Sequence, residues 1–587
     1  MKILFFSPHA FTTVHSVPEA IVAEALKERG HEIIMVNCDG ALASYCISMS
    51  SAKLTPQAST VEKESICKTC RKRRDLILKE FGFRSLMLDN FINHDDELAI
   101  QNIIQTLTPE RFTELTWMDI PIGRYALYEL IIRNKLRSYN LNTAEWEEYK
   151  IYLYNTLKSA YAGRKILEEI KPDAVATYNA LYSVNHIVCA QAEQHGIPYY
   201  TLHAGGHIKW RLSTMTIFKG LMAPALTTRQ IAWKQLSNIP ISASKVQVVA
   251  EHIQELLKAT SPWVYSVASN KASPESLKEF FGIEKDKSVL LATMSSADEL
   301  FAAITIDGTP TFPEPMFPTQ IDWIKALIEF VGKRNDVFLI IRVHPREFPN
   351  KRDGVLSKQA IELQKFFVDL PGNVRVNWPQ DQVSIHDVVK ITDVGLNSIS
   401  TAGLELSMFG VPVVLYDSNQ LLAYPPGINY VATNPNDYFQ KIDMALKEGW
   451  SFENVRKTFR WLSYTFEYVA IDISDGFGKA VKLSIFKKAY NYALRKLIGI
   501  RSEDQELIRS LRNRPVPVKN SELLSIAIER GLESHLDLVT PLDEEKSCPD
   551  EETLAIKEWV GKLARLIHTE EDLSDDFNRK IRQVLSG

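Results

Sequence analysis

Two apolar strands that each end in a polar cluster constrain the fold of this chain more than any other feature. The first, residues 338–343, is apolar except for Arg342 and runs into His344 and Pro345. A continuous apolar run is typical of a parallel strand that is covered on both faces. The second, residues 391–396, leads into a hydroxyl-rich turn, a helical segment and another apolar strand at residues 411–416. This alternation predicts an α/β domain with a parallel sheet.

The polar clusters at the two strand ends form a candidate ligand site. Ligands of open α/β sheets bind beyond the carboxyl ends of the strands, so His344 and the turn at residues 398–401 are expected to share one crevice. Hydroxyls and free backbone N–H groups at a helix start suit a phosphate. Glu405 stands at a spacing that does not fit a capping box, which favours a ribose contact. A purely structural interpretation, with capping hydroxyls and a histidine that closes a turn, stays open.

These residues resemble a His-Pro motif and a downstream Ser/Thr motif of bacterial GT-B glycosyltransferases that build capsules and other surface polysaccharides. The matching segments are residues 342–345 and 398–405, followed by 410–414. Polysialyltransferases, Kdo transferases and CDP-glycerol glycerophosphotransferases share this pair. The similarity covers roughly residues 285–475, and the N-terminal half is similar only in its general plan.

The resemblance implies an α/β protein of the GT-B fold, with two facing doubly wound Rossmann-like domains and a helical C-terminal extension. It also implies inverting transfer of a sugar or related group from an activated nucleotide to a surface polysaccharide or lipid-linked acceptor. The residues expected at the donor nucleotide are Ser295, Ser296, Arg342, His344, Pro345, Ser398, Ser400, Thr401 and Glu405. No Asp-x-Asp pair stands at a strand end, so we expect no catalytic metal.

The length of 587 residues exceeds what one hydrophobic core usually supports. We expect an acceptor-side domain over residues 1–255, a donor domain over 256–475 and the extension over 476–587. With 45% hydrophobic residues and a net charge of −4, the composition is that of a globular protein and predicts no nucleic-acid partner.

Four polar side chains in the N-terminal half are candidate catalytic groups. His9, His15 and Glu19 follow the first strand, residues 2–6, in a loop at the edge that would face the acceptor. His203 ends a strand at residues 196–202 and precedes two glycines, which allow a ligand to approach the backbone. Solvated loop histidines and a tight turn would give the same pattern without catalysis.

Four cysteines in the N-terminal half, Cys38, Cys46, Cys67 and Cys70, suggest a structural zinc site. The last two are separated by two residues, a spacing that lets both sulfurs reach one tetrahedral ion. The basic run at residues 71–74 would offset the charge of four thiolates. Free thiols beside a solvated basic helix are the alternative.

The N-terminal apolar run is too short for a signal peptide, and no segment reaches the roughly 18 apolar residues of a membrane span. We therefore expect a cytoplasmic protein. Residues 479–519 hold eleven Lys or Arg and three Asp or Glu, with apolar residues at helical spacing. Such a basic amphipathic helix predicts peripheral contact with the anionic inner face of the membrane. Packing of this helix on the protein body is the alternative.

The chain carries no dinucleotide fingerprint, Walker loop or nucleophile elbow, which disfavours a dehydrogenase, kinase or hydrolase. Two alternatives to a transferase remain. One is a nucleotide-sugar epimerase of the same fold, which eliminates the nucleotide without needing an acceptor. The other is a non-catalytic polysaccharide assembly protein that keeps the fold as a scaffold.

Overall fold

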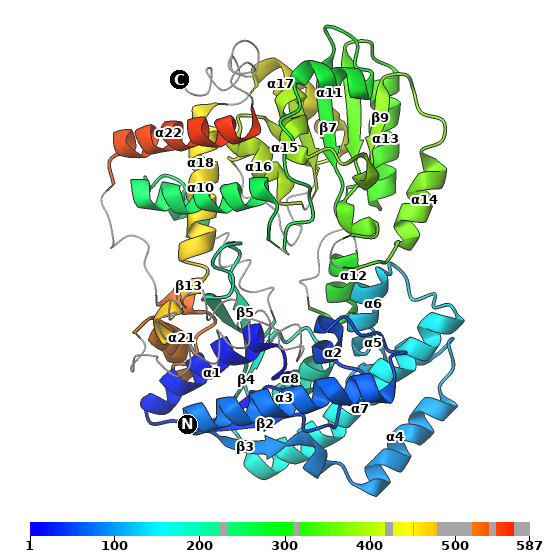
Figure 1. Ribbon diagram of the computed structural model, residues 1–587, viewed down its shortest axis with the longest axis vertical. Coiled ribbons are helices and arrows are strands. Elements are labelled where there is room, and N and C mark those ends of the chain that lie inside the picture. Colours follow the sequence, from blue (N-terminus) through cyan, green and yellow to red (C-terminus); the bar gives the residue numbers. More distant parts are fainter. Residues whose placement is uncertain are drawn as a thin grey trace, which may run out of the picture.

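The computed structural model shown in Figure 1 contains two α/β domains, each built on one mainly parallel sheet. The N-terminal domain occupies the lower half of Figure 1, and the C-terminal domain occupies the upper half. The described residues are 1–221, 232–261, 263–296, 298–308, 316–350, 353–398, 400–416, 427–449, 451–477, 519–538 and 547–568. The predicted GT-B architecture of two facing Rossmann-like domains is confirmed.

The N-terminal sheet has the strand order β13-β6-β5-β4-β1-β2-β3. Its strands are β1 (Lys2–Phe6), β2 (Glu32–Asn37), β3 (Arg84–Met87), β4 (Ala174–Tyr178), β5 (Tyr199–Ala204), β6 (Thr214–Lys219) and β13 (Ile471–Asp472). The first five are parallel, whereas β6 runs antiparallel to both of its neighbours, β5 and β13. The order reverses between β1 and β4, and the loops after these strands form the place where a Rossmann-like domain binds ligands.

The C-terminal sheet repeats this order as β12-β11-β10-β7-β8-β9, with all pairs parallel. Its strands are β7 (Ser288–Thr293), β8 (Val337–Arg342), β9 (Val374–Asn377), β10 (Val394–Asn397), β11 (Val413–Leu415) and β12 (Tyr430–Val431). Every residue of β8 is buried, as the apolar run predicts for a strand covered on both faces. The order reverses between β7 and β10, which places the switch point at the ends of these two strands.

Helix α1 (Thr13–Glu28) begins within the segment that the sequence analysis assigns to a loop after the first strand. His15 and Glu19 therefore lie on a helix and not in a loop. Pro18 has no N–H to donate within α1, but Val17 and Ala20 on either side are fully buried in the core, and this packing outweighs the missing bond.

Further helices cover both faces of the N-terminal sheet. They are α2 (Ile47–Ser51), α3 (Thr60–Phe81), α4 (His94–Thr106), α5 (Ile122–Tyr125), α6 (Tyr128–Asn134), α7 (Thr143–Ile170) and α8 (Ser183–Gln194). The helices of the second half are α10 (Ala243–Lys258), α11 (Pro274–Phe281), α12 (Asp298–Thr305), α13 (Gln320–Gly332), α14 (Lys358–Phe366), α15 (Ile385–Val388), α16 (Ala402–Met408), α17 (Pro435–Glu448), α18 (Phe452–Glu467), α21 (Lys519–Glu529) and α22 (Pro549–Ile567).

The chain passes between the domains more often than the predicted boundaries at residues 255 and 475 imply. Helix α10 falls inside the predicted N-terminal range, but its buried face packs with α18 and α22 in the core of the C-terminal domain. The predicted extension is divided, because α21 packs on α1 while α22 packs on α10 (Figure 1). Composition marks the loops, whereas the amphipathic faces of α10, α21 and α22 decide to which domain each helix belongs.

The predicted basic helix at residues 479–519 lies almost entirely outside the described residues, since residues 478–518 are not among them. Within the described ranges, no helix is long and apolar enough to cross a membrane.

Candidate functional site

A pocket of about 140 Å³ opens at the carboxyl edge of the C-terminal sheet, at the ends of β7, β8 and β10. This is the switch point of the strand order. The pocket is lined by Leu256, Trp263, Val264, Tyr265, Ser266, Thr293, Met294, Arg342, Val343, His344, Pro345, Ile385, His386, Ser400, Thr401, Ala402 and Glu405. The structure thus brings the His-Pro segment and the hydroxyl-rich turn to one crevice.

The ring of His344 is held in one tautomer. Its Nδ1 accepts a hydrogen bond of 3.2 Å from the backbone N–H of Arg346, so the neutral ring carries its proton on Nε2. Burial lowers the pKa of His344 to about 3, and the neighbouring charges of Arg346, Arg342 and Lys135 act in the same direction. At neutral pH the imidazole is therefore an uncharged donor through Nε2.

Arg342 supplies positive charge to the pocket wall. Its buried guanidinium donates to the side chain of Asn377 and, over 3.0 Å, to the carbonyl of Val383. Burial lowers the pKa of Arg342 to about 10, against the opposing charges of Glu405 and Asp381. The group still stays protonated at neutral pH, and its hydrogen bonds fix it where an anion would arrive.

The carboxylate of Glu405 forms a hydrogen bond of 2.9 Å between its Oε2 and Nε2 of His386. His386 is a pocket residue that the sequence analysis missed. It belongs to the short helix α15, 19 positions before Glu405, and no local pattern connects the two. The pair fixes the orientation of the carboxylate that the sequence predicts for the ribose.

The hydroxyl-rich turn contributes two of its three predicted residues to the pocket lining, Ser400 and Thr401. The carbonyl of Ser400 accepts a bond of 2.6 Å from Asn397, whose Oδ1 accepts 2.9 Å from the hydroxyl of Thr293 on β7. This network fixes the turn to the neighbouring strand. The third residue, Ser398, is buried and does not line the pocket.

The sequence analysis expects Ser295 and Ser296 at the donor nucleotide, but neither residue lines the pocket. The hydroxyl of Ser296 instead donates to the carboxylates of Asp298 and, over 3.0 Å, Glu347. Asp298 also pairs with Arg346 at 2.6 Å. These residues brace the loop after β7, which is a supporting role for the pocket.

The four predicted catalytic residues gather at the carboxyl edge of the N-terminal sheet. The rings of His15 and Tyr178 stack with centroids 4.2 Å apart, and Tyr178 stacks in turn on His203 at 6.0 Å. His9 meets the edge of Tyr182 at 6.0 Å. Residues from the loop after β1, from α1, from the end of β4 and from β5 therefore meet at the switch point of this sheet.

His203 has the tautomer that a general base requires. Its Nδ1 donates to the carbonyl of Ala204 over 3.0 Å, which leaves Nε2 unprotonated. Burial and, to a smaller extent, the charge of Arg211 lower the pKa of His203 to about 4. His203 is therefore neutral, with a free lone pair on Nε2, at physiological pH.

Glu19 and His9 are less suited to act as the base. Burial raises the pKa of Glu19 to about 8, so this carboxyl is mostly protonated at neutral pH, and its Oε1 accepts 3.1 Å from the N–H of Tyr178. Burial lowers the pKa of His9 to about 3, close to that of His203, so the pKa does not separate the two histidines. Neither ring nitrogen of His9 has a hydrogen-bond partner among the described residues.

Arg211 connects the two halves of the site. Its guanidinium lies 5.0 Å from the ring centre of Trp263, a residue that lines the pocket of the C-terminal domain. The same charge acts on His15 and His203. The sequence analysis missed Arg211. The two glycines after His203 identified the loop, but nothing in the pattern indicated that the arginine later in this loop would reach the site.

Contacts between the two domains fix the carboxyl edge of one sheet relative to that of the other. The buried ammonium of Lys135 on the N-terminal side donates 2.7 Å to the carbonyl of Val355 and pairs with Asp353 at 2.8 Å. Arg346, which fixes the tautomer of His344, donates 3.2 Å to the carbonyl of Ile132 in α6. The pocket of the C-terminal domain is therefore connected directly to the N-terminal domain.

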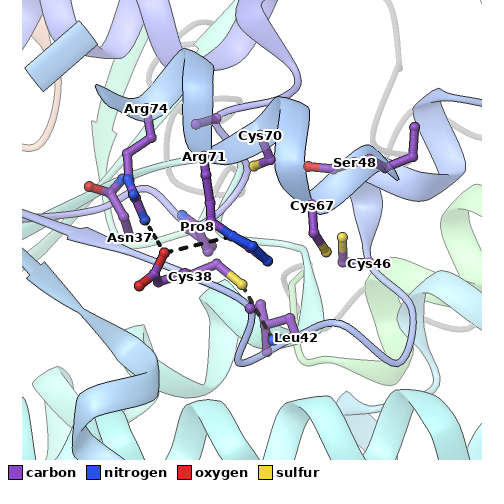
Figure 2. Close-up of a pocket in the computed structure, with 14 residues that line it drawn as sticks. Pro8, Asn37, Cys38, Leu42, Cys46, Ser48, Cys67, Cys70, Arg71 and Arg74 are labelled. Carbon is purple, nitrogen blue, oxygen red and sulfur yellow. Dashed lines mark hydrogen bonds and ion pairs between the residues drawn. The ribbon is translucent and has the colours of Figure 1, made fainter. Parts of the chain in front are cut away.

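The four predicted zinc ligands line a second, smaller pocket. Cys38 follows β2, Cys46 precedes α2, and Cys67 and Cys70 lie on α3 (Figure 2). No group of three or more His, Cys, Asp or Glu side chains in the described ranges is positioned to hold a metal ion. The cysteines share one pocket, but they do not form the compact tetrahedral zinc site that the spacing predicts.

No family model matches the sequence, and no curated protein matches it. Among solved structures, the UDP-GlcNAc 2-epimerase from Neisseria meningitidis bound to UDP-GlcNAc is 12% identical over 80% of this chain and 98% of its own, with a TM-score of 0.27. The β-Kdo 2,4 transferase KpsC from Thermosulfurimonas dismutans is 11% identical over 49% of this chain and 79% of its own, with a TM-score of 0.30.

The calicheamicin glycosyltransferase CalG4 is 13% identical over 79% of this chain and 94% of its own, with a TM-score of 0.24. These similar structures include both glycosyltransferases and epimerases. Identities and TM-scores this low assign no reaction to this chain.

Proposed function

We propose that the protein is an inverting glycosyltransferase, which moves a sugar or related group from an activated nucleotide to a surface polysaccharide or lipid-linked acceptor. The observation that carries this proposal is a pair of histidines of opposite tautomer on the two domains. His344 offers a proton on Nε2 in the donor-side pocket, and His203 offers a lone pair on Nε2 at the facing edge. A transfer reaction needs one of each.

The donor would lie in the pocket of the C-terminal domain. His344, Ser400 and Thr401 would hold its phosphates, and Arg342 would stabilise their charge from the pocket wall. Glu405, oriented by His386, would bind the ribose hydroxyls. Donors fixed in advance at the position where charge grows on the leaving phosphate commonly supply a large part of catalysis.

The acceptor hydroxyl would approach from the N-terminal domain. His203 Nε2 would take its proton while the oxygen attacks the anomeric carbon opposite the nucleotide, which inverts the configuration. Tyr178, stacked between His15 and His203, would keep the base in its plane. Arg211 beside Trp263 would add positive charge between the leaving phosphate and the base.

A nucleotide-sugar epimerase is the second candidate, because the same edge carries two buried carboxyls suited to acid and base steps. Burial raises the pKa of Glu19 to about 8 and that of Glu129 to about 7. Glu129 accepts 2.8 Å from the N–H of Ser183. Elimination and re-addition of a nucleotide would use such a pair and would need no acceptor.

The test begins with calorimetric binding of CMP, CDP, UDP and GDP to the full chain. The sugar nucleotides of the base that binds are then incubated, isotopically labelled, with and without oligosaccharide acceptors. Product that forms only with acceptor supports the transferase. A changed sugar without acceptor supports the epimerase instead, and nucleotide binding without either reaction, or no binding at all, overturns the enzyme and leaves a scaffold.

A further inference from the structure

We propose that Trp263 and Tyr265 form an aromatic platform for the transferred group, and that this group is a sugar ring rather than an open-chain unit such as glycerol. Both residues lie between α10 and α11 and line the pocket of the C-terminal domain. They stand outside the His-Pro and Ser/Thr segments of the sequence. The platform rests on the proposed function, because only a transfer reaction brings such a group to this place.

The two rings lie between the pocket and the carboxyl edge of the N-terminal sheet, the acceptor-side edge. The ring of Tyr265 meets that of His344 with centroids 5.8 Å apart. The ring of Trp263 lies 5.0 Å from the guanidinium of Arg211, whose charge acts on His203. These contacts form a row of side chains between the two histidines.

The transferred group is expected along this row. In an inverting reaction the attacking oxygen and the departing oxygen stand on opposite faces of the reacting carbon. His344 would hold the departing phosphate and His203 would hold the acceptor hydroxyl, so the transferred group lies between them. Trp263 and Tyr265 are then the side chains beside it.

An aromatic face suits a sugar ring better than it suits glycerol. One face of a pyranose carries C–H groups, which pack against the electron-rich face of an indole or phenol ring and leave water as they do so. A glycerol unit is flexible and has no flat apolar face of this size. Two half-buried aromatic rings on the wall of a pocket with polar groups therefore favour a cyclic donor group.

The nucleobase is expected at the other end of the pocket. Glu405, which we propose for the ribose, is bonded to His386. Ile385 and Leu256 line the pocket as well, and both pack in the core that includes residues of α16. The ribose separates the base from the phosphates, so a base bound beyond Glu405 meets this apolar wall and leaves Trp263 to the sugar.

The segment that carries the two rings is fixed in place. Val264, between them, is buried. The hydroxyl of Tyr265 accepts 3.3 Å from Arg346, and farther along the segment the hydroxyl of Ser269 donates 2.6 Å to the carboxylate of Asp387. The platform is thus formed before a ligand arrives, which lowers the entropic cost of binding.

The test compares two esters of the nucleotide that the screen of CMP, CDP, UDP and GDP identifies, one with glycerol and one with a pyranose. The esters carry the same charge, so the difference between their calorimetric Kd values reports the sugar ring. We expect the pyranose ester to bind about tenfold more tightly, the size of one stacking contact. Equal affinities, or tighter binding of the glycerol ester, overturn the platform. Failure of the unchanged protein to bind any nucleotide overturns the proposed function, and the platform with it.

Variants locate the platform. Trp263→Ala should lose most of this preference while the Kd of the glycerol ester stays unchanged, and Trp263→Phe, which keeps an aromatic face, should retain part of it. Trp559→Ala is the matched control, because Trp559 is also half-buried with a cation near its ring, the ammonium of Lys562 at 4.4 Å, but does not line the pocket.

The outcomes for Trp263→Ala separate the platform from the proposed function. A variant that keeps the full preference for the pyranose ester refutes the platform and leaves the transferase intact. A variant that binds both esters equally weakly places the indole at the base instead, and also refutes the platform. Binding of the glycerol ester with normal affinity shows that the variant is folded.

Discussion

Different interactions position the side chains in the donor-side pocket and those at the acceptor-side edge. In the pocket, hydrogen bonds fix the key side chains: His344 to a backbone N–H, Arg342 to Asn377, and Glu405 to His386. At the acceptor-side edge, His203 also has a hydrogen bond, but ring stacking and burial position most of the side chains, and His9 has no hydrogen-bond partner within the described ranges. The pocket is thus preorganised for one charged group. The edge, in contrast, has polar atoms with which an acceptor could form hydrogen bonds.

The first prediction tests whether the base lies on the acceptor-side edge. His203→Ala should lower kcat by about 10²- to 10⁴-fold, the range that general-base catalysis contributes. Nucleotide affinity should stay unchanged, because the donor-side pocket lies on the other domain. Steady-state kinetics and calorimetry measure both. His195→Ala, an exposed histidine of the same domain, is the matched control, and equal activity of the two variants would remove His203 as the base.

The second prediction concerns preorganisation of the pocket. His344→Ala should lower turnover by roughly 10²-fold, since one lost donor at a developing charge costs about 3 kcal/mol. The melting temperature should change little, because the ring only caps a short turn. Turnover close to that of the unchanged protein, or an unfolded variant, would argue against a contact between His344 and the donor phosphates.

The third prediction separates the ribose contact from the chemistry. Glu405→Gln keeps the shape of the side chain but removes its charge, and one charge-assisted hydrogen bond is worth about 1.5 kcal/mol or more. We expect the KM for the donor to rise about tenfold while kcat changes little. A fall in kcat at constant KM would place Glu405 at the reacting atoms instead.

The fourth prediction concerns stability at the acceptor-side edge. Because burial raises the pKa of Glu19 to about 8, the folded chain binds a proton between about pH 4.5 and pH 8 that the unfolded chain has released. This contribution to stability is complete at low pH and is lost as the pH rises through 8. Glu19→Gln does not titrate, so its stability relative to the unchanged protein should increase with pH across this window. Urea unfolding at both ends of the window measures it, and a constant difference would refute a raised pKa.

The sequence predicted what is encoded locally. An apolar run followed by His-Pro identifies β8 and its end, and hydroxyls before a helix identify the turn after β10, so parallel topology alone brings His344 and Ser400 together. The contact between His386 and Glu405 and the position of Arg211 against Trp263 join distant positions that no local pattern relates. The same limit applies to the cysteines, whose spacing indicated a shared site but not the distances between sulfurs.

Helix α22 has a consequence for how the protein is made. Its buried residues complete the core of the C-terminal domain, and the fully buried Glu552 pairs with Arg460 of α18 at 2.6 Å. On a ribosome, the sheet that carries the donor-side pocket emerges well before residue 552. Until α22 arrives, Arg460 lacks this partner and an apolar face of α10 and α18 is uncovered, which favours chaperone binding or aggregation. The N-terminal domain also waits for β13 and α21, so neither half can mature alone while the chain is still being synthesised.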